Sequence, residues 1–266
     1  MSFFTNENWK LHILKKSLKK SLGLEQRKRD IAKVQKEYSA HWMHPRSLEK
    51  PRLALRGNIP ILQTHPDFFK SSIEYVTRLI RGLQIKTALE IGSGDGLFTT
   101  ALKILNPSVE FCGVELTDEG IAASRIVLDR SMDVLTYVTE KNADEIREIF
   151  KNTKIPQFEK GNATLLNAAD NSFDLVFSHI AIEQMPTIYP AVFNEAYRVS
   201  RKYGCFIEEF REAQKGFFQR LTLWKNDYFR ASYRVVEKAG FAIVSFDVKA
   251  VDKASHSVGM LLCVKK

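Results

Sequence analysis

The sequence predicts an α/β protein whose core is a mostly parallel sheet with helices on both faces. From Lys86 onward, short apolar segments alternate with helical patterns, which is the order that crossover connections between parallel strands produce. Early in this region a buried strand runs directly into a turn with three glycines and then into a helix, at residues 88–97. The chain ends on two neighbouring strand patterns, at 241–248 and 258–264. Together these observations indicate one sheet of seven strands.

The individual elements follow from apolar spacing, because strands bury every second residue and helices every third or fourth. The expected strands are residues 88–91, 110–116, 157–160, 174–178, 205–210, 241–248 and 258–264. The expected helices are residues 67–83, 97–105, 119–130, 189–201 and 227–239, with a further charged helical segment at 131–155. Residues 41–66 are rich in Pro, Arg and His and have no regular pattern, which is typical of a connecting or lid segment.

Charge divides the chain into two parts. Residues 1–60 hold 14 of the 40 Lys and Arg but only 5 of the 31 Asp and Glu, so the remaining 26 of each cancel and the net charge of +9 belongs to this N-terminal arm. We therefore expect a basic arm with a lid segment at 1–60 and a catalytic domain at 61–266. Enzymes that act on nucleic acid more often spread basic residues around the cleft, so a nucleic-acid partner is disfavoured.

Within the arm, residues 9–36 have the pattern of a basic amphipathic helix. Leu11, Leu14, Leu18 and Leu22 recur at helical spacing, and lysines occupy positions between them. Two interpretations have equal weight: a helix on an anionic membrane surface, and a helix docked on its own domain with a solvated lysine face. An organelle transit peptide is a third interpretation, which the predominance of lysine over arginine disfavours.

The cysteines and the hydropathy indicate the compartment. The three cysteines, at 112, 205 and 263, have neither a disulfide framework nor a zinc-ligand spacing. No apolar run approaches the length that spans a bilayer, and the N-terminus lacks the apolar region of a secretory signal. We expect a cytoplasmic protein, peripheral to the membrane if the arm binds lipid.

The glycine turn carries the first indication of function. Gly92, Gly94 and Gly96 have no side chains, so a ligand can approach the main chain closely. With Glu90 before it, the turn resembles the first motif of class I S-adenosylmethionine (SAM)-dependent methyltransferases, in particular the small-molecule type 11 group. Four later segments resemble the same family in the same order. They are Gly113–Thr117, Lys160–Ala163, Asp170–Met185 and Asn194–Gly204.

The resemblance covers residues 85–266 and implies a Rossmann-like, seven-stranded methyltransferase sheet with an antiparallel last strand, after an N-terminal helical extension. It implies SAM as the cofactor, with Glu115 accepting from the ribose hydroxyls and Asn162, in place of the usual Asp, accepting from the adenine amino group. The implied cofactor-binding residues are Glu90, Gly92, Ser93, Gly94, Asp95, Gly96, Glu115, Leu116, Asn162, Ala163 and Ser178. Because Glu115 and Asn162 are unusually far apart, residues 131–155 look like a helical insertion, over the acceptor site or between copies of the chain.

Methyl transfer from a sulfonium demands mainly positioning, and a base helps only when the acceptor is protonated. The candidate catalytic residues for a hydroxyl acceptor are His179, Glu208 and Glu209, which end expected strands. For His179 a structural role beside the cofactor has equal weight. For the two glutamates a solvated loop or a partnership with Arg211 is favoured. No acidic cluster has metal-ligand spacing, so we expect no metal.

The main hypothesis is a SAM-dependent methyltransferase that acts on a hydroxyl oxygen of a small molecule. The expected acceptor is lipid-linked or lies close to a membrane. The alternatives are a non-catalytic, methyltransferase-like binding module and an RNA methyltransferase anchored by its basic arm. Glu90, the three glycines and Glu115 favour the enzyme, because a module without SAM has no physical need of them. The sequence leaves the acceptor molecule, its reacting atom and the oligomeric state open.

Overall fold

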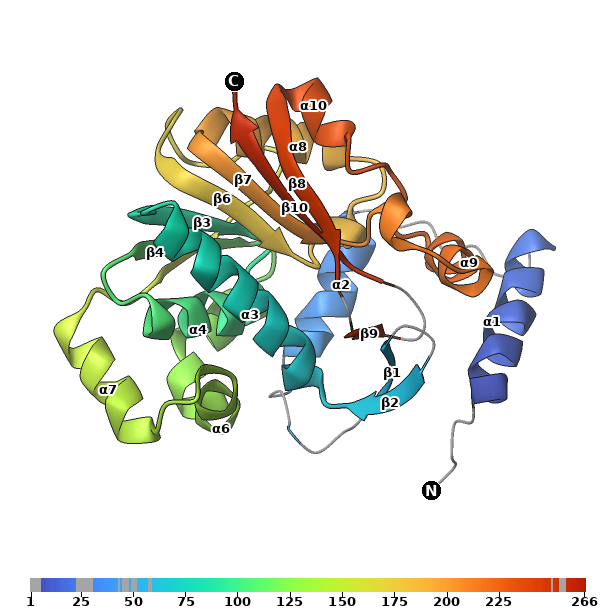
Figure 1. Cartoon of the computed structure of the whole chain (residues 1–266), viewed down its shortest axis with the longest axis horizontal. Coiled ribbons are helices and arrows are strands. Elements are labelled where there is room, and N and C mark those ends of the chain that lie inside the picture. Colours follow the sequence, from blue (N-terminus) through green and yellow to red (C-terminus); the bar gives the residue numbers. More distant parts are fainter. Residues whose placement is uncertain are drawn as a thin grey trace.

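The computed structural model describes residues 6–22, 31–42, 44, 48, 52–56, 59–249, 251–253 and 257–266. Its centre is a seven-stranded sheet in the order β5-β4-β3-β6-β7-β10-β8 (Figure 1). The strands are β3 (Thr87–Ile91), β4 (Glu110–Glu115), β5 (Gln157–Lys160), β6 (Phe173–His179), β7 (Ser200–Glu208), β8 (Phe241–Val248) and β10 (Gly259–Lys265). Strands β3 to β7 run parallel, whereas β10 is antiparallel to both β7 and β8. The expected fold class and its antiparallel last strand are confirmed.

Helices cover both faces of this sheet. Phe177 on β6 packs into an apolar cluster with α3, α4, α6 and α7, while its neighbour Val176 packs into a second cluster with α8 and α10. Since successive residues of a strand point to opposite faces, the two clusters lie on opposite sides of the sheet. The helices of the domain are α3 (His65–Gly82), α4 (Leu97–Leu105), α5 (Asp118–Arg125), α6 (Val127–Thr139), α7 (Ala143–Asn152), α8 (Tyr189–Val199), α9 (Phe217–Asn226) and α10 (Val235–Ala239).

The arm contains two helices where one was expected at 9–36. They are α1 (Asn6–Ser21) and α2 (Ile31–Trp42), and residues 23–30 between them lie outside the described part of the chain. In Figure 1, α1 lies at the periphery next to α9, whereas α2 lies by the carboxyl ends of the parallel strands. The two halves of the basic arm therefore have different neighbours.

Residues 41–66 were expected to be irregular, and this expectation was wrong for much of the segment. Strands β1 (Arg52–Arg56) and β2 (Ile59–Gln63) pair antiparallel, and β9 (Val251–Lys253) joins the other edge of β1. The partner that completes this small sheet comes from near the end of the chain, so local sequence patterns could not indicate it.

Residues 131–155 hold most of α6 and all of α7. Val134, Leu135, Val138 and Ile146 are buried in the apolar cluster on the α3 and α4 face. Two expected helices differ from the structure: the one at 119–130 is divided between α5 and α6, and the one at 227–239 is reduced to α10. Asp227 has a left-handed φ of 55° and ends the unexpected helix α9.

Candidate cofactor and acceptor site

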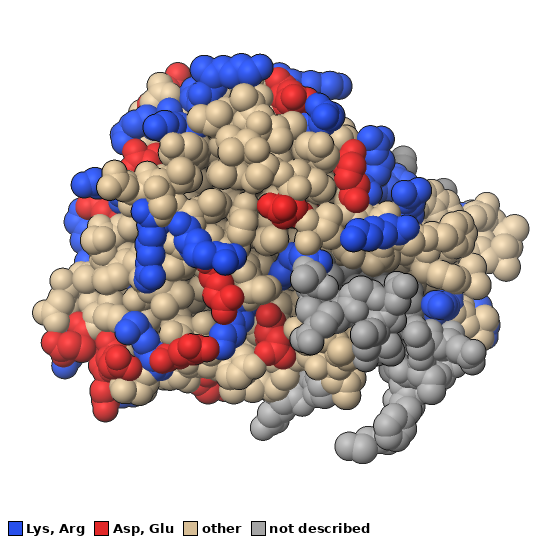
Figure 2. Space-filling model, in the orientation of Figure 1, with Lys and Arg blue, Asp and Glu red and all other residues tan. Residues whose placement is uncertain are grey.

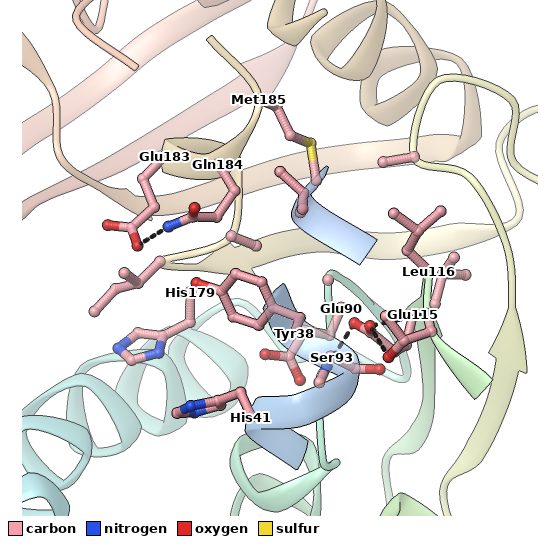
Figure 3. A pocket seen from close by; sticks show the side chains of 18 of the residues that line it. Tyr38, His41, Glu90, Ser93, Glu115, Leu116, His179, Glu183, Gln184 and Met185 are labelled. Carbon is pink, nitrogen blue, oxygen red and sulfur yellow. Dashed lines mark hydrogen bonds between the residues drawn. The ribbon is translucent and has the colours of Figure 1, made fainter. Parts of the chain in front are cut away.

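A cavity of about 780 Å³ lies at the carboxyl ends of β3, β4, β5 and β6, where open α/β sheets bind their ligands (Figure 3). Its floor is the glycine turn and the strand ends, and its roof is α2. The floor residues include Glu90, Gly92, Ser93, Gly94, Glu115, Leu116, Asn162, Ala163 and His179. The roof and the far wall include Tyr38, His41, Trp42, Phe68, Phe69, Gln184 and Tyr228.

The glycine turn is held in a conformation that only glycine adopts easily. Gly92 and Gly94 have φ values of 73° and 56°. A Cβ on Gly92 would lie 2.4 Å from the Cβ of Ala181, and one on Gly94 would lie 2.6 Å from the ring of Trp42. The turn is pinned by amides of Gly92 and Ser93, which donate to the Val114 carbonyl at 2.8 and 3.0 Å. A side chain at either glycine would therefore collide with a residue that packs against the cavity floor.

Glu115 lies buried at the end of β4 and already accepts three hydrogen bonds. Its Oε1 accepts from the Thr117 amide at 3.0 Å and the Thr117 hydroxyl at 2.7 Å, while its Oε2 accepts from the Gly94 amide at 3.1 Å. A carboxylate has about four acceptor sites, so one remains on Oε2. Glu115 also lines the cavity, which places this acceptor on the floor.

Asn162 lines the cavity beside Ala163, in the turn after β5. Its side-chain oxygen accepts from both the amide and the hydroxyl of Thr164, each at 3.0 Å. Both lone pairs of that oxygen are engaged, whereas the sequence assigned the same oxygen to the adenine amino group. In this arrangement the group that Asn162 offers a ligand is the Nδ2 donor.

Three of the sequence-implied cofactor residues lie behind the floor and do not line the cavity. Asp95 accepts from the Leu97 amide at 3.4 Å at the start of α4. Gly96 is the N-cap of α4, and a Cβ there would meet Phe158 and Ser124 at 2.8 Å. Ser178 is fully buried and donates to Glu208 at 2.7 Å. These residues build the turn and the strand end without facing the cavity.

His179 is in the cavity wall and is held by its neighbours. Its ring stacks on Phe98 with centroids 4.3 Å apart and lies 5.0 Å from the ring of Phe69. Its Nε2 is 3.2 Å from the hydroxyl of Ser72, which also accepts from the buried Lys249 ammonium at 3.0 Å. This ring is therefore fixed in orientation, which suits either of the roles predicted for it.

Glu208 and Glu209 are fully buried and line no part of the cavity, so the solvated-loop interpretation is wrong for both. Oε1 of Glu208 accepts from Ser178 and from the Ala181 amide at 3.1 Å, and its Oε2 accepts from the Glu183 amide at 3.2 Å. Burial raises the pKa of Glu208 to about 7. Glu208 is placed to hold the loop after β6, which forms the cavity wall from His179 to Met185.

Sequence reasoning missed the roof. Helix α2 supplies Tyr38, His41 and Trp42, whose rings contact one another with the Trp42 centroid 4.7 Å from His41 and 5.6 Å from Tyr38. The aromatic residues at 41–44 were assigned to a lid segment, and docking on the domain was one of two equal interpretations of residues 9–36. No local pattern placed Tyr38 at the cavity. The segment 131–155 contributes no residue to the cavity lining.

The residues present fit SAM. The cavity floor offers an acceptor on Glu115, a donor on Asn162 and the exposed main chain of two lining glycines, Gly92 and Gly94. The buried hydroxyl of Ser93 has no hydrogen-bond partner within the described part of the chain. Among the described residues, no group of three or more His, Cys, Asp or Glu is placed to hold a metal ion.

Part of the chain matches a known protein family. Residues 89–207 match the family model described as "Methyltransferase domain". The search of curated proteins found no match. Among solved structures, magnesium protoporphyrin IX methyltransferase from Synechocystis PCC 6803, crystallised with SAH, is 11% identical with a TM-score of 0.53, covering 74% of this chain and 83% of that one.

Two further structures have the same fold. A putative sarcosine dimethylglycine methyltransferase from Galdieria sulphuraria is 12% identical with a TM-score of 0.52, covering 75% of this chain and 85% of that one. The (4+2)-cyclase SpnF is 13% identical with a TM-score of 0.56, covering 87% and 94%. Residues 89–207 thus match a methyltransferase domain, and the solved structures share its fold. The residues that line the cavity fit SAM as the cofactor.

Proposed function

We propose that this protein transfers the SAM methyl group to a hydroxyl oxygen of a small molecule that binds in the same cavity, between α2 and the loop after β6. The observation that carries the proposal is the composition of this cavity. Cofactor-binding groups on its floor share one space with an aromatic wall and with His179. Cavities of this size hold ligands of small-molecule dimensions, and a large polymer would meet the α2 roof.

The chemistry assigned to each residue is simple. SAM supplies an activated methyl group when bound, and the chain's own groups orient the reactants and exclude water. The glycine turn, Glu115 and Asn162 hold the cofactor, and Trp42 closes over the turn. The imidazole of His179, which lines the cavity, takes the proton from the acceptor hydroxyl as a general base.

Gln184 is proposed to position the acceptor. Its Nε2 donates to Oε1 of Glu183, and its own side-chain oxygen is buried in the cavity wall without a partner among the described residues (Figure 3). A buried amide oxygen without a partner costs about 1–3 kcal/mol, so a ligand hydroxyl that donates to it is favoured. In the family that this chain resembles, a histidine usually occupies this position.

The proposed acceptor is a lipid-linked or membrane-proximal molecule. Phe68, Phe69 and Tyr228 give the cavity an apolar, aromatic side that suits a hydrophobic acceptor. Within the described residues, no helix is both long enough and apolar enough to cross a bilayer. Contact with lipid would therefore take place at the surface of the domain.

The decisive experiment is transfer of a labelled methyl group from SAM into separated lipid and soluble extracts, with mass spectrometry of the product. We expect label on a hydroxyl of a small lipid-fraction molecule, and loss of transfer in His179→Asn with SAM affinity retained. Calorimetry with SAM runs in parallel. Tight SAM binding without transfer to any fraction would leave a non-catalytic module, and label in RNA would instead favour an RNA methyltransferase.

A further inference from the structure

We infer that α1 is a docking surface for an anionic lipid bilayer. Four leucines lie on one face of this helix and its last turn, at positions three and four apart. They are largely exposed: Leu11 at 50%, Leu14 at 43%, Leu18 at 62% and Leu22 at 63% of the full residue surface. The domain's own surface leaves this apolar stripe uncovered, and a contiguous apolar stripe of this kind marks an interaction site.

The other side of α1 is attached to α9, which fixes the direction in which the leucines face. Ile13 and Ser17 are buried on that side. The ammonium of Lys20 donates to the Trp224 carbonyl at 2.6 Å and lies 4.9 Å from the centre of its ring. Lys10 lies 5.5 Å from the centre of the Phe218 ring. A single helix thus uses one face for its domain and presents the other to the surroundings.

The charges beside the leucine stripe of α1 indicate which kind of partner it binds. Lys15 and Lys19 are exposed and lie next to the leucines on the helical surface, and Glu7 is the one acid between residues 6 and 21. An apolar stripe flanked by lysines matches an anionic bilayer, whose headgroups attract each basic residue with about 1 kcal/mol. A second copy of the chain would bring like charges together around the same leucines, which disfavours self-association.

Helix α9 connects this surface to the cavity. Phe218 and Trp224 contact α1, while Tyr228, just after the helix, lines the cavity. Phe217 at the start of α9 is 69% exposed and adds apolar surface at this edge. In the part of this edge that Figure 2 draws in colour, uncharged residues lie beside Lys or Arg side chains. The purpose of docking, delivery of a membrane-proximal acceptor, rests on the proposed function, whereas lipid binding itself does not.

The test is cosedimentation of the full chain with vesicles of phosphatidylcholine alone and with vesicles of equal parts phosphatidylcholine and phosphatidylglycerol. We expect binding to the anionic vesicles only. Lys15→Gln with Lys19→Gln should weaken it about thirtyfold, because two basic residues contribute about 1 kcal/mol each. Leu11→Ser, Leu14→Ser and Leu18→Ser together should abolish it. Ile155→Ser and Lys151→Gln remove equally exposed side chains elsewhere and should leave binding unchanged.

Each other outcome overturns the inference. Wild-type protein that stays in the supernatant with anionic vesicles removes the bilayer as partner. If the triple leucine variant sediments like the wild type, the lipid-binding site lies outside α1. Light scattering that detects a dimer lost in the leucine variant assigns the stripe to a second copy. SAM titration of the same variants separates this result from the proposed function, because α1 lines no part of the cavity.

Discussion

The two helices of the basic arm lie within one predicted amphipathic segment and its end, and they have different surroundings in the fold. Helix α1 leaves its leucines exposed, buries Ile13 and attaches to α9 through Lys20. Helix α2 directs Tyr38 and Trp42 into the cavity, over the glycine turn. Amphipathic spacing states that a helix has an apolar face, but the tertiary structure decides what that face meets. One arm thereby serves both the cofactor cavity and the outer surface.

The roof that α2 forms can close the cavity only if the opposite wall, the loop after β6, keeps its position. The largest predicted effect concerns this wall, which Glu208 holds. Burial raises the pKa of Glu208 to about 7 from its ordinary value of 4.5. The folded state therefore binds the extra proton between these values, and stability falls as pH rises through the range. The shift corresponds to a loss on the order of 3 kcal/mol. Glu208→Gln should remove this slope in urea unfolding measured between pH 4.5 and pH 8.

A matched control for Glu208 is Glu148→Gln, at an exposed carboxylate of α7. It should reproduce the wild-type slope over the same pH range. A Glu208→Gln protein with the full wild-type slope would show that another group produces it. Because Glu208 accepts from the amides of Ala181 and Glu183, its substitution should also raise the KM for the acceptor more than that for SAM.

The next prediction tests α2 as the roof. Gly94→Ala places a methyl group 2.6 Å from the ring of Trp42 and puts alanine at a φ of 56°. The left-handed backbone alone costs about 1–2 kcal/mol, and with the overlap we expect SAM affinity to fall about a hundredfold by calorimetry. Trp42→Gly should cost less SAM affinity in the Gly94→Ala background than in the wild type, because there it also removes the overlap. Strictly additive losses would mean that the two residues do not meet in solution.

The domain was more predictable than the arm, for a physical reason. Residues 97–105 and 241–248 were expected with the bounds that the structure has, because each carries a local apolar pattern and packs into one of the two apolar clusters. Lining residues such as Gly92 and Glu115 were predicted from a resemblance that spans contiguous segments. Local apolar patterns and the order of the family's motifs were sufficient to predict elements that pack against segments close to them in the sequence.

The roof and the small sheet depend on contacts that no local pattern encodes. Tyr38 reaches the cavity because α2 packs by the strand ends, and β9 pairs with β1 from the far end of the chain. Glu208 was predicted at the right strand end but in a solvated loop, whereas it is fully buried and holds the loop after β6 through Ala181 and Glu183. Burial of a carboxylate is a property of the assembled fold.

Truncation to alanine in each of the two helices tests whether α1 and α2 have separate roles. Trp42→Ala removes the ring that covers the glycine turn, and we expect SAM affinity to fall about tenfold, or about 1.4 kcal/mol. Leu18→Ala removes a side chain that is 62% exposed and should leave SAM affinity unchanged while weakening vesicle binding. The pair separates the helices if the two variants affect different ligands. A shared loss of SAM affinity would instead mean that α1 and α2 act as one unit.

The smallest predicted effect concerns how α1 is attached. Lys20→Met removes the hydrogen bond to the Trp224 carbonyl and the contact with its ring, and should cost about 1 kcal/mol of local stability. Hydrogen exchange of the α1 amides should then be about fivefold faster, whereas Lys19→Met, at an exposed position, should leave it unchanged. Because Lys20 points toward the domain, its loss should alter vesicle binding less than the loss of Lys15 and Lys19. Equal effects of Lys19 and Lys20 on exchange would mean that α1 is not held by α9, and the division of the helix into a domain face and a lipid face would fail.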